Sequence, residues 1–117
     1  MNYYKKDIRH IKGTTYSFGF IIEDLDQDLE SVYFTCRENL NDDSEIIFEK
    51  SLEDGISLVE YDVENDIRKY IVRVAPEDTK EIQTGTYYYG LVINVNTDTF
   101  PLMRGKFILE QNSRKEE

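Results

Sequence analysis

Apolar residues occupy every second position along the stretch 87–95, and this alternation is the strongest constraint that the sequence places on its fold. Successive side chains of a β-strand point to opposite faces, so the pattern predicts a long strand with one buried face. The apolar positions are Tyr87, Tyr89, Leu91, Ile93 and Val95. Residues 16–22, 32–36 and 67–74 alternate in the same way and predict further strands of this kind.

Turn-forming residues separate the alternating stretches, as Asp54-Gly55 does between two of them. Pro76, followed by Glu77 and Asp78, predicts one short helix over residues 77–82, which Gly85 ends. We expect about eight strands, at residues 8–11, 16–22, 32–36, 46–48, 56–59, 67–74, 87–95 and 99–109. The sequence therefore predicts an all-β fold, an immunoglobulin-like antiparallel β-sandwich with one short helix.

The chain of 117 residues is the size of one domain, and we expect a single β-sandwich over residues 1–112 with a polar tail at 113–117. Its one cysteine, Cys36, cannot form an internal disulfide. The first residues contain no apolar segment typical of a signal peptide, and no apolar run reaches the roughly 18 residues that span a bilayer. These features predict folding in the cytoplasm and no membrane anchor.

The charge balance is strongly acidic, with 14 basic and 24 acidic residues and a net charge of -10. Such a chain repels phosphate backbones and anionic lipid surfaces. We therefore expect neither nucleic acid nor membrane among its partners.

Residue types that carry catalysis or bind metals are few or badly spaced. His10 is the sole histidine, and Cys36 continues an apolar alternation, which is typical of a buried cysteine. Asp24, Asp26 and Asp28 have the spacing of a calcium loop, but Leu29 stands where that loop requires glycine. The sequence predicts no catalytic residue, no cofactor and no metal site, and hence no enzyme.

Several tyrosines and arginines are candidates for a protein interface, because exposed aromatic and guanidinium groups anchor partners. Tyr88 is expected on the face opposite Tyr87 and Tyr89, and the segment near the first strand adds two further rings. The candidate interface residues are Tyr3, Tyr4, Tyr33, Tyr88, Arg73 and Arg104.

Four segments follow one another in a fixed order along the chain: residues 28–35, 74–79, 85–89 and 105–109. The second contains Ala75-Pro76-Glu77-Asp78-Thr79, and the third contains Gly85-Thr86-Tyr87. Together they resemble the amino-terminal domain of upper baseplate proteins from tailed phages of Gram-positive bacteria. The resemblance implies an immunoglobulin-like sandwich that serves as a non-catalytic structural part of the virion. It also implies phage tail or baseplate partners, a homo-oligomer such as a trimer or ring, and a role in mounting receptor-binding proteins or fibres.

Two other functions stay open from the residues alone. A carbohydrate-binding module would require exposed tyrosines on one face, for which Tyr33, Tyr61 and Tyr88 are the candidates. A cytosolic protein-interaction module unrelated to phages would be favoured if the neighbouring genes were metabolic genes and not tail genes.

Overall fold

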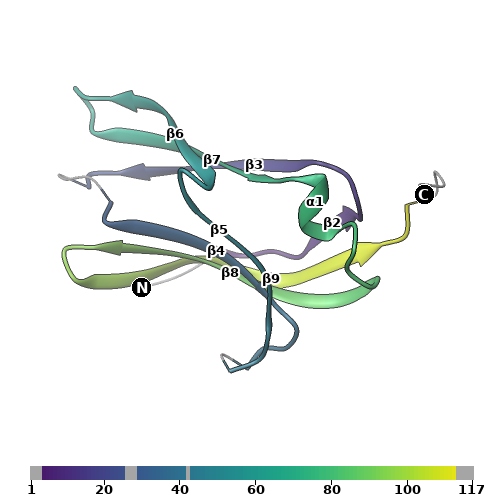
Figure 1. The fold of residues 1–117 in the computed structure, drawn as a ribbon. Coiled ribbons are helices and arrows are strands. Elements are labelled where there is room, and N and C mark those ends of the chain that lie inside the picture. Colours follow the sequence, from purple (N-terminus) through teal and green to yellow (C-terminus); the bar gives the residue numbers. More distant parts are fainter. Residues whose placement is uncertain (1–3, 26–28, 42, 113–117) are drawn as a thin grey trace.

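The computed structural model describes residues 4–25, 29–41 and 43–112, and within them the chain is almost entirely β-strand. Nine strands are present there, in the order shown in Figure 1. Their bounds are β1 Tyr4–Lys5, β2 Ile8–Ile11, β3 Tyr16–Glu23, β4 Ser31–Arg37, β5 Ile46–Leu52, β6 Gly55–Asp62, β7 Ile67–Val74, β8 Gly85–Val95 and β9 Asp98–Glu110. The prediction of an all-β fold is confirmed, although β1 was not foreseen.

The strands form one curled, hydrogen-bonded sheet in the order β1-β9-β8-β4-β5-β6-β7-β3, with β2 also paired to β9. The link between β5 and β6 consists of only two pairings, Ser51 with Gly55 and Leu52 with Ile56. The sheet turns sharply at this link, so β6, β7 and β3 lie over the layer formed by β4, β8 and β9 (Figure 1).

The sheet is mixed, so the prediction of wholly antiparallel strands is wrong. β1 and β2 run parallel to β9, and β5 runs parallel to β6 where they meet. The Lys6 N–H donates to the Arg104 carbonyl at 3.1 Å, and the Tyr89 hydroxyl donates to the Lys6 carbonyl at 2.6 Å. These bonds fix residues 4–11 along β9 as a parallel edge.

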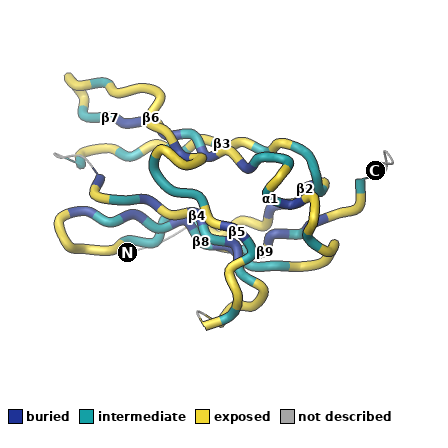
Figure 2. The backbone as a smooth tube through the Cα atoms, in the orientation of Figure 1, coloured by how far each residue is buried: buried dark blue, intermediate teal, exposed yellow. Residues whose placement is uncertain are grey.

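The core lies between the two layers, and buried positions alternate with less buried ones along β4 and most of β8 (Figure 2). Phe34 on β4 is fully buried. Its ring lies 5.5 Å from Phe18 on β3, 5.3 Å from Tyr89 on β8 and 6.1 Å from Phe48 on β5, measured between centroids. Phe34 therefore joins the two layers.

The single described helix, α1 (Pro76–Thr79), carries the chain from β7 to β8 and is shorter than the predicted span of 77–82. It ends at Thr79 because the next residues form a turn, in which the Ile82 N–H donates to the Thr79 carbonyl at 2.9 Å and Ile82 packs on the core. Gly85 begins β8 and does not end the helix. An ion pair of 2.7 Å between Lys50 Nζ and Asp78 Oδ2 holds α1 to β5.

His10 on β2 is the sole histidine of the chain, and its ring lies in the core. The side chain is buried between the rings of Tyr16 and Phe107, and among the described residues its Nε2 has no hydrogen-bond partner. Burial lowers the pKa of His10 below its usual 6.5, with a hydrogen bond to the Thr14 backbone opposing that effect. The folded protein therefore binds the proton less readily than the unfolded chain does.

We expect the free energy of unfolding to be highest above the ordinary histidine pKa and to fall as the pH drops below it, because the unfolded state then takes up the proton. Urea unfolding at about pH 7.5 and about pH 5 measures this change. The variant His10→Leu should show a smaller loss between the same two pH values. An equal loss in both proteins would assign the pH dependence to the carboxylates instead.

Candidate functional site

The outer face of β4, β8 and β9 carries the most distinctive surface of the described chain. Residues of β8 alternate, with Tyr89 and Leu91 turned to the core and Tyr88 and Gly90 turned outward. The pairings place Tyr88 beside Arg37 of β4, and Gly90 beside Arg104 of β9. Positions that are distant in the sequence thus share one surface.

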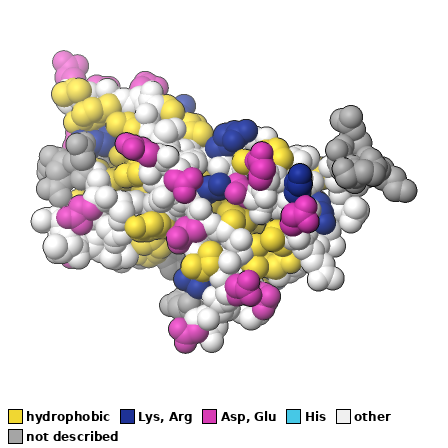
Figure 3. All heavy atoms as spheres, viewed as in Figure 1, with side chains coloured by type: hydrophobic (Ala, Val, Ile, Leu, Met, Phe, Trp, Pro, Cys, Tyr) yellow, Lys and Arg dark blue, Asp and Glu magenta, His cyan; other side chains and the backbone are white. Residues whose placement is uncertain are grey.

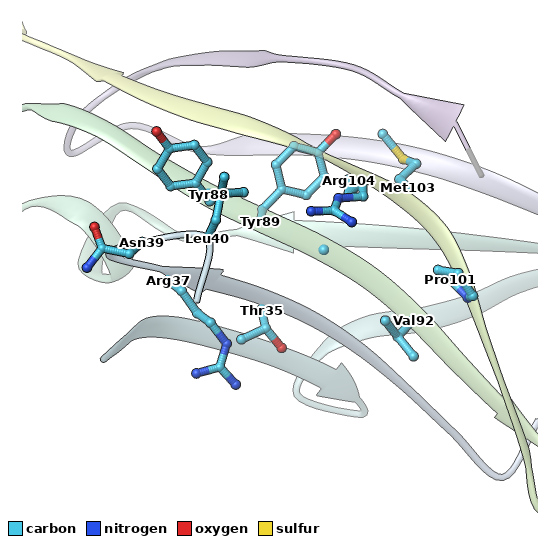
Figure 4. Close-up of a pocket in the computed structure, with 11 residues that line it drawn as sticks. Thr35, Arg37, Asn39, Leu40, Tyr88, Tyr89, Val92, Pro101, Met103 and Arg104 are labelled. Carbon is cyan, nitrogen blue, oxygen red and sulfur yellow. The ribbon is translucent and has the colours of Figure 1, made fainter. Parts of the chain in front are cut away.

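Two neighbouring hollows form a groove on this face, which we call the β8 groove. The first encloses about 290 Å³ and is lined by Thr35, Arg37, Asn39, Leu40, Tyr88, Tyr89, Gly90, Val92, Pro101, Met103 and Arg104. The second encloses about 520 Å³ and is lined by Lys5, Lys6, Asp7, Leu40, Tyr88, Arg104, Gly105 and Lys106. Figure 4 shows Tyr88 beside Leu40, with Arg104 and Met103 on one side and Val92 and Pro101 further along.

Gly90 explains why the face is hollow at this point. A Cβ atom built there would meet no atom within 4 Å, so the missing side chain leaves open space between Tyr88 and Val92. The neighbouring strands supply Thr35 and Arg104 on either side of it. The floor of the first hollow is therefore backbone, flanked by side chains.

The loop between β4 and β5 holds Leu40 over both hollows. Arg37 Nη1 donates to the Ser44 carbonyl at 2.8 Å. Ser44 Oγ lies 3.1 Å from the Asn39 carbonyl and 2.7 Å from the Asn41 carbonyl. These bonds join residues on either side of Leu40, which is 64% exposed.

The groove is basic although the chain as a whole is acidic. Five cations line it, whereas the net charge of the chain is -10. One carboxylate, that of Asp7, also lines the second hollow and accepts a hydrogen bond of 3.1 Å from the Lys106 N–H. The cations are Lys5, Lys6, Arg37, Arg104 and Lys106.

The structure brings together some of the predicted interface residues and separates others. Tyr88 and Arg104 line the groove, and Tyr4 lies on the adjacent edge, where it pairs with Met103 and is 62% exposed. Tyr33 is exposed on β4 opposite Val92, outside the lining of both hollows. Arg73 lies on β7, in the other layer. Tyr3 falls outside the described residues.

Sequence reasoning missed Leu40, Lys5 and Lys6. Leu40 belongs to no periodic pattern in the sequence. The two lysines reach the groove because β1 pairs with β9, and the sequence near β1 does not predict this pairing. Continuing the register of the predicted hairpin from its turn would pair Tyr88 with Gly105, and the bulge between Leu91 and Val92 moves the partner of Tyr88 to Lys106.

The residues considered for catalysis do not assemble a reactive site. Cys36 is fully buried, and desolvation raises the pKa of its thiol to about 12, so the thiol stays protonated at neutral pH. His10 contacts Tyr16 and Phe107. Across residues 4–25, 29–41 and 43–112, no three His, Cys, Asp or Glu side chains are grouped as a metal site. Asp26 and Asp28 lie outside the described residues.

No helix in the described part of the chain is both long and apolar enough to cross a membrane. The described helix, α1, has four residues and connects β7 to β8.

No family model matches the sequence, and no curated protein matches it either. Among solved structures, a family 123 glycoside hydrolase from Clostridium perfringens, described for glycolipid glycan hydrolysis, is similar with a TM-score of 0.58 and 8% identity. The match covers 96% of this chain and 24% of the enzyme, so the chain spans about a quarter of the enzyme's length. At this identity the likeness shows a shared fold alone.

Voltage-gated sodium channel β subunits, studied for multimeric cell-adhesive interactions, give a TM-score of 0.42 at 14% identity, covering 92% of this chain and 93% of theirs. The extracellular domain of the β4 subunit, solved as parallel homodimers, gives 0.41 at 14% identity, covering 92% of each chain.

Proposed function

We propose that this protein is a non-catalytic structural subunit of a phage tail or baseplate, which docks protein partners in the β8 groove. The observation that carries the proposal is the groove itself, a basic and partly apolar hollow surface on an otherwise acidic chain. The phage setting rests on the resemblance of residues 28–35, 74–79, 85–89 and 105–109 to upper baseplate proteins. In that setting the subunit works in the virion, as a homo-oligomer that helps to mount receptor-binding proteins or fibres.

An immunoglobulin-like sandwich is the fold that we propose for this subunit, with its layers joined at β5 and β6. The strand order supports it, because β6-β7-β3 and β9-β8-β4-β5 correspond to the D-E-B and G-F-C-C′ orders of that fold. The Tyr87 hydroxyl donates to the Gln83 carbonyl at 2.5 Å at the start of β8, as the tyrosine corner of such domains does. Phe34, packed on Tyr89, occupies the core position between the layers.

The first hollow of the groove contains residue types that are enriched at protein interfaces. Aromatic side chains, Met and Arg are enriched at such interfaces. Tyr88, Met103 and Arg104 line the first hollow together, and Leu40 projects beside them. These side chains come from a paired sheet and a hydrogen-bonded loop, so a partner would meet a surface that is already ordered.

A carbohydrate platform is less well supported, because its three candidate tyrosines lie apart. Tyr61 is on β6, where Arg68 Cζ lies 4.3 Å from the ring centroid and Arg68 Nη2 donates to the hydroxyl at 3.1 Å. Tyr33 and Tyr88 are on the other layer. Sugar rings stacked on one face would need these rings side by side.

We expect the purified full chain to form a complex with one of the purified tail proteins encoded beside it, and Arg104→Glu to weaken that complex about tenfold or more. Arg73→Glu is the matched control, because it makes the same change on an exposed strand position away from the groove. Calorimetric titration measures both affinities.

Two results would count against the proposed function. One is the absence of any complex with those tail proteins, combined with retention of the chain on host cell-wall polysaccharide. The other is an equal loss of affinity in Arg104→Glu and Arg73→Glu, which would place the docking surface elsewhere.

A further inference from the structure

We infer that the β8 groove receives the end of the β6–β7 hairpin of a second copy, so that copies join head to tail. The inference rests on the proposed function in one respect, because it treats the groove as a protein-docking surface. It then names the occupant and the geometry of the contact. We call the inserting part, residues 58–66, the β6–β7 tip.

The β6–β7 tip exposes apolar side chains. Val63 is 72% exposed at the turn, and Leu58, Val59 and Tyr61 are between 41% and 53% exposed on the strand that leads to it. Figure 3 shows hydrophobic side chains gathered over this hairpin at the upper left, with acidic side chains at its end. An exposed cluster of this kind is typical of a contact surface.

Contacts within the hairpin brace the turn of the tip. Asn65 donates to the Asp62 carboxylate through its backbone N–H at 3.2 Å and its side-chain amide at 2.9 Å. Arg68 is buried beneath the turn, where its Nη1 lies 3.0 Å from Asp66 Oδ1 and its Nη2 donates to Tyr61. Val63 is therefore presented on a turn that needs no rearrangement before it docks.

The charges of the tip and the groove are opposite. Asp62 and exposed Glu64 flank Val63, and exposed Glu60 lies further along β6, where it is paired with Lys69. In the groove, Arg37 and Arg104 flank the first hollow, and Lys5, Lys6 and Lys106 line the second. Opposite potentials of this kind steer and orient association.

The apolar parts also match. The first hollow offers Leu40, Tyr88, Val92, Pro101 and Met103 as an apolar lining within about 290 Å³. A valine side chain on a narrow turn fits such a hollow, and the flanking Asp62 and Glu64 would then face the arginines at the rim. The contact thus places an apolar residue at the centre and charge pairs around it, as specific interfaces do.

One chain cannot make this contact with itself. The tip stands at the end of the upper layer in Figure 1, whereas the groove is on the face of β4, β8 and β9 that is turned away from that layer. Tip and groove are different surfaces, so each copy would use one of each. Such a heterologous contact closes into a ring or continues as a filament.

Sedimentation of the full-length chain tests the contact with two variants that each spoil one surface. Arg104→Glu spoils the groove and keeps the tip, and Val63→Arg spoils the tip and keeps the groove. At low salt, about 25 mM, we expect the unaltered chain to associate and each variant alone to associate about 100-fold more weakly. A mixture of the two variants should form dimers that contain one of each and grow no further.

Arg73→Glu should associate as the unaltered chain does, and thermal unfolding checks that every variant is folded. The inference is overturned if the unaltered chain stays monomeric at about 200 µM in low salt, or if the mixed variants fail to form dimers. The inference is also overturned if Arg104→Glu and Val63→Arg each associate as strongly as the unaltered chain. A monomer that binds a tail protein, and binds it more weakly as Arg104→Glu, would end this inference and leave the docking role that we propose for the groove standing.

Discussion

Replacing Gly105 with alanine is expected to lower the free energy of unfolding by roughly 3 kcal/mol. A Cβ atom at this position would lie 2.0 Å from the Lys6 carbonyl oxygen and 2.7 Å from its carbon. Both are backbone atoms, so the added methyl group can fit only if β1 and β2 move away from β9. The bonds of Lys6 to Arg104 and Tyr89 are then lost together.

Gly90→Ala is the matched control, because Gly90 lies in the strand paired with β9 and has no atom within 4 Å of its added Cβ. Its free energy of unfolding should change by less than about 0.5 kcal/mol. Urea unfolding compares the two variants, and hydrogen exchange should show lost protection at residues 6–11 in Gly105→Ala alone. Equal stability of the two variants would contradict the close approach of residues 4–11 to β9.

Truncating Phe34 to alanine is expected to cost about 3 to 5 kcal/mol, because the ring is fully buried and removing it leaves a cavity between the layers. Phe18, Phe48 and Tyr89 would each lose an aromatic neighbour. For a domain of this size the midpoint of thermal unfolding should fall by at least about 12 °C. Scanning calorimetry gives that midpoint directly.

Tyr33→Ala on the same strand provides the comparison for Phe34→Ala. Tyr33 points outward and is 39% exposed, so its loss should cost less than about 1 kcal/mol. Similar losses in the two variants would show that β4 does not bury the face that contains Phe34.

Most strands were predictable because they bury alternate residues. This alternation can be recognised in the sequence of a strand without knowing which strands lie beside it. Tyr70, Val72 and Val74 show it on β7, and all three are buried. The parallel pairing of β1 and β2 with β9 was not predictable, because bonds such as Lys6 to Arg104 join residues almost a hundred positions apart. The predicted helix was too long because the chain turns after Thr79, and this turn packs Ile82 against the core.

The candidate site was predictable only in part. Tyr88 could be assigned to the outer face because it lies between Tyr87 and Tyr89, which were predicted to face the core. Arg104 could be assigned to the outer face by the same alternation along the last predicted strand. Their meeting depends on the register of the β8–β9 hairpin, which includes a bulge between Leu91 and Val92. Arg73 lies in the other layer because β7 pairs with β6 and β3. The sequence around Arg73 does not show which strands β7 pairs with.

The parallel edge formed by residues 4–11 also constrains when the protein can finish folding. Its partner, β9, spans residues 98–110, so a ribosome makes the partner only after it has synthesised the other strands of the sheet. Until then the edge has no strand to join, and His10 has no Phe107 to pack against. Completion of the sheet must therefore follow translation of β9, and pairing across such a sequence separation is expected to be slow.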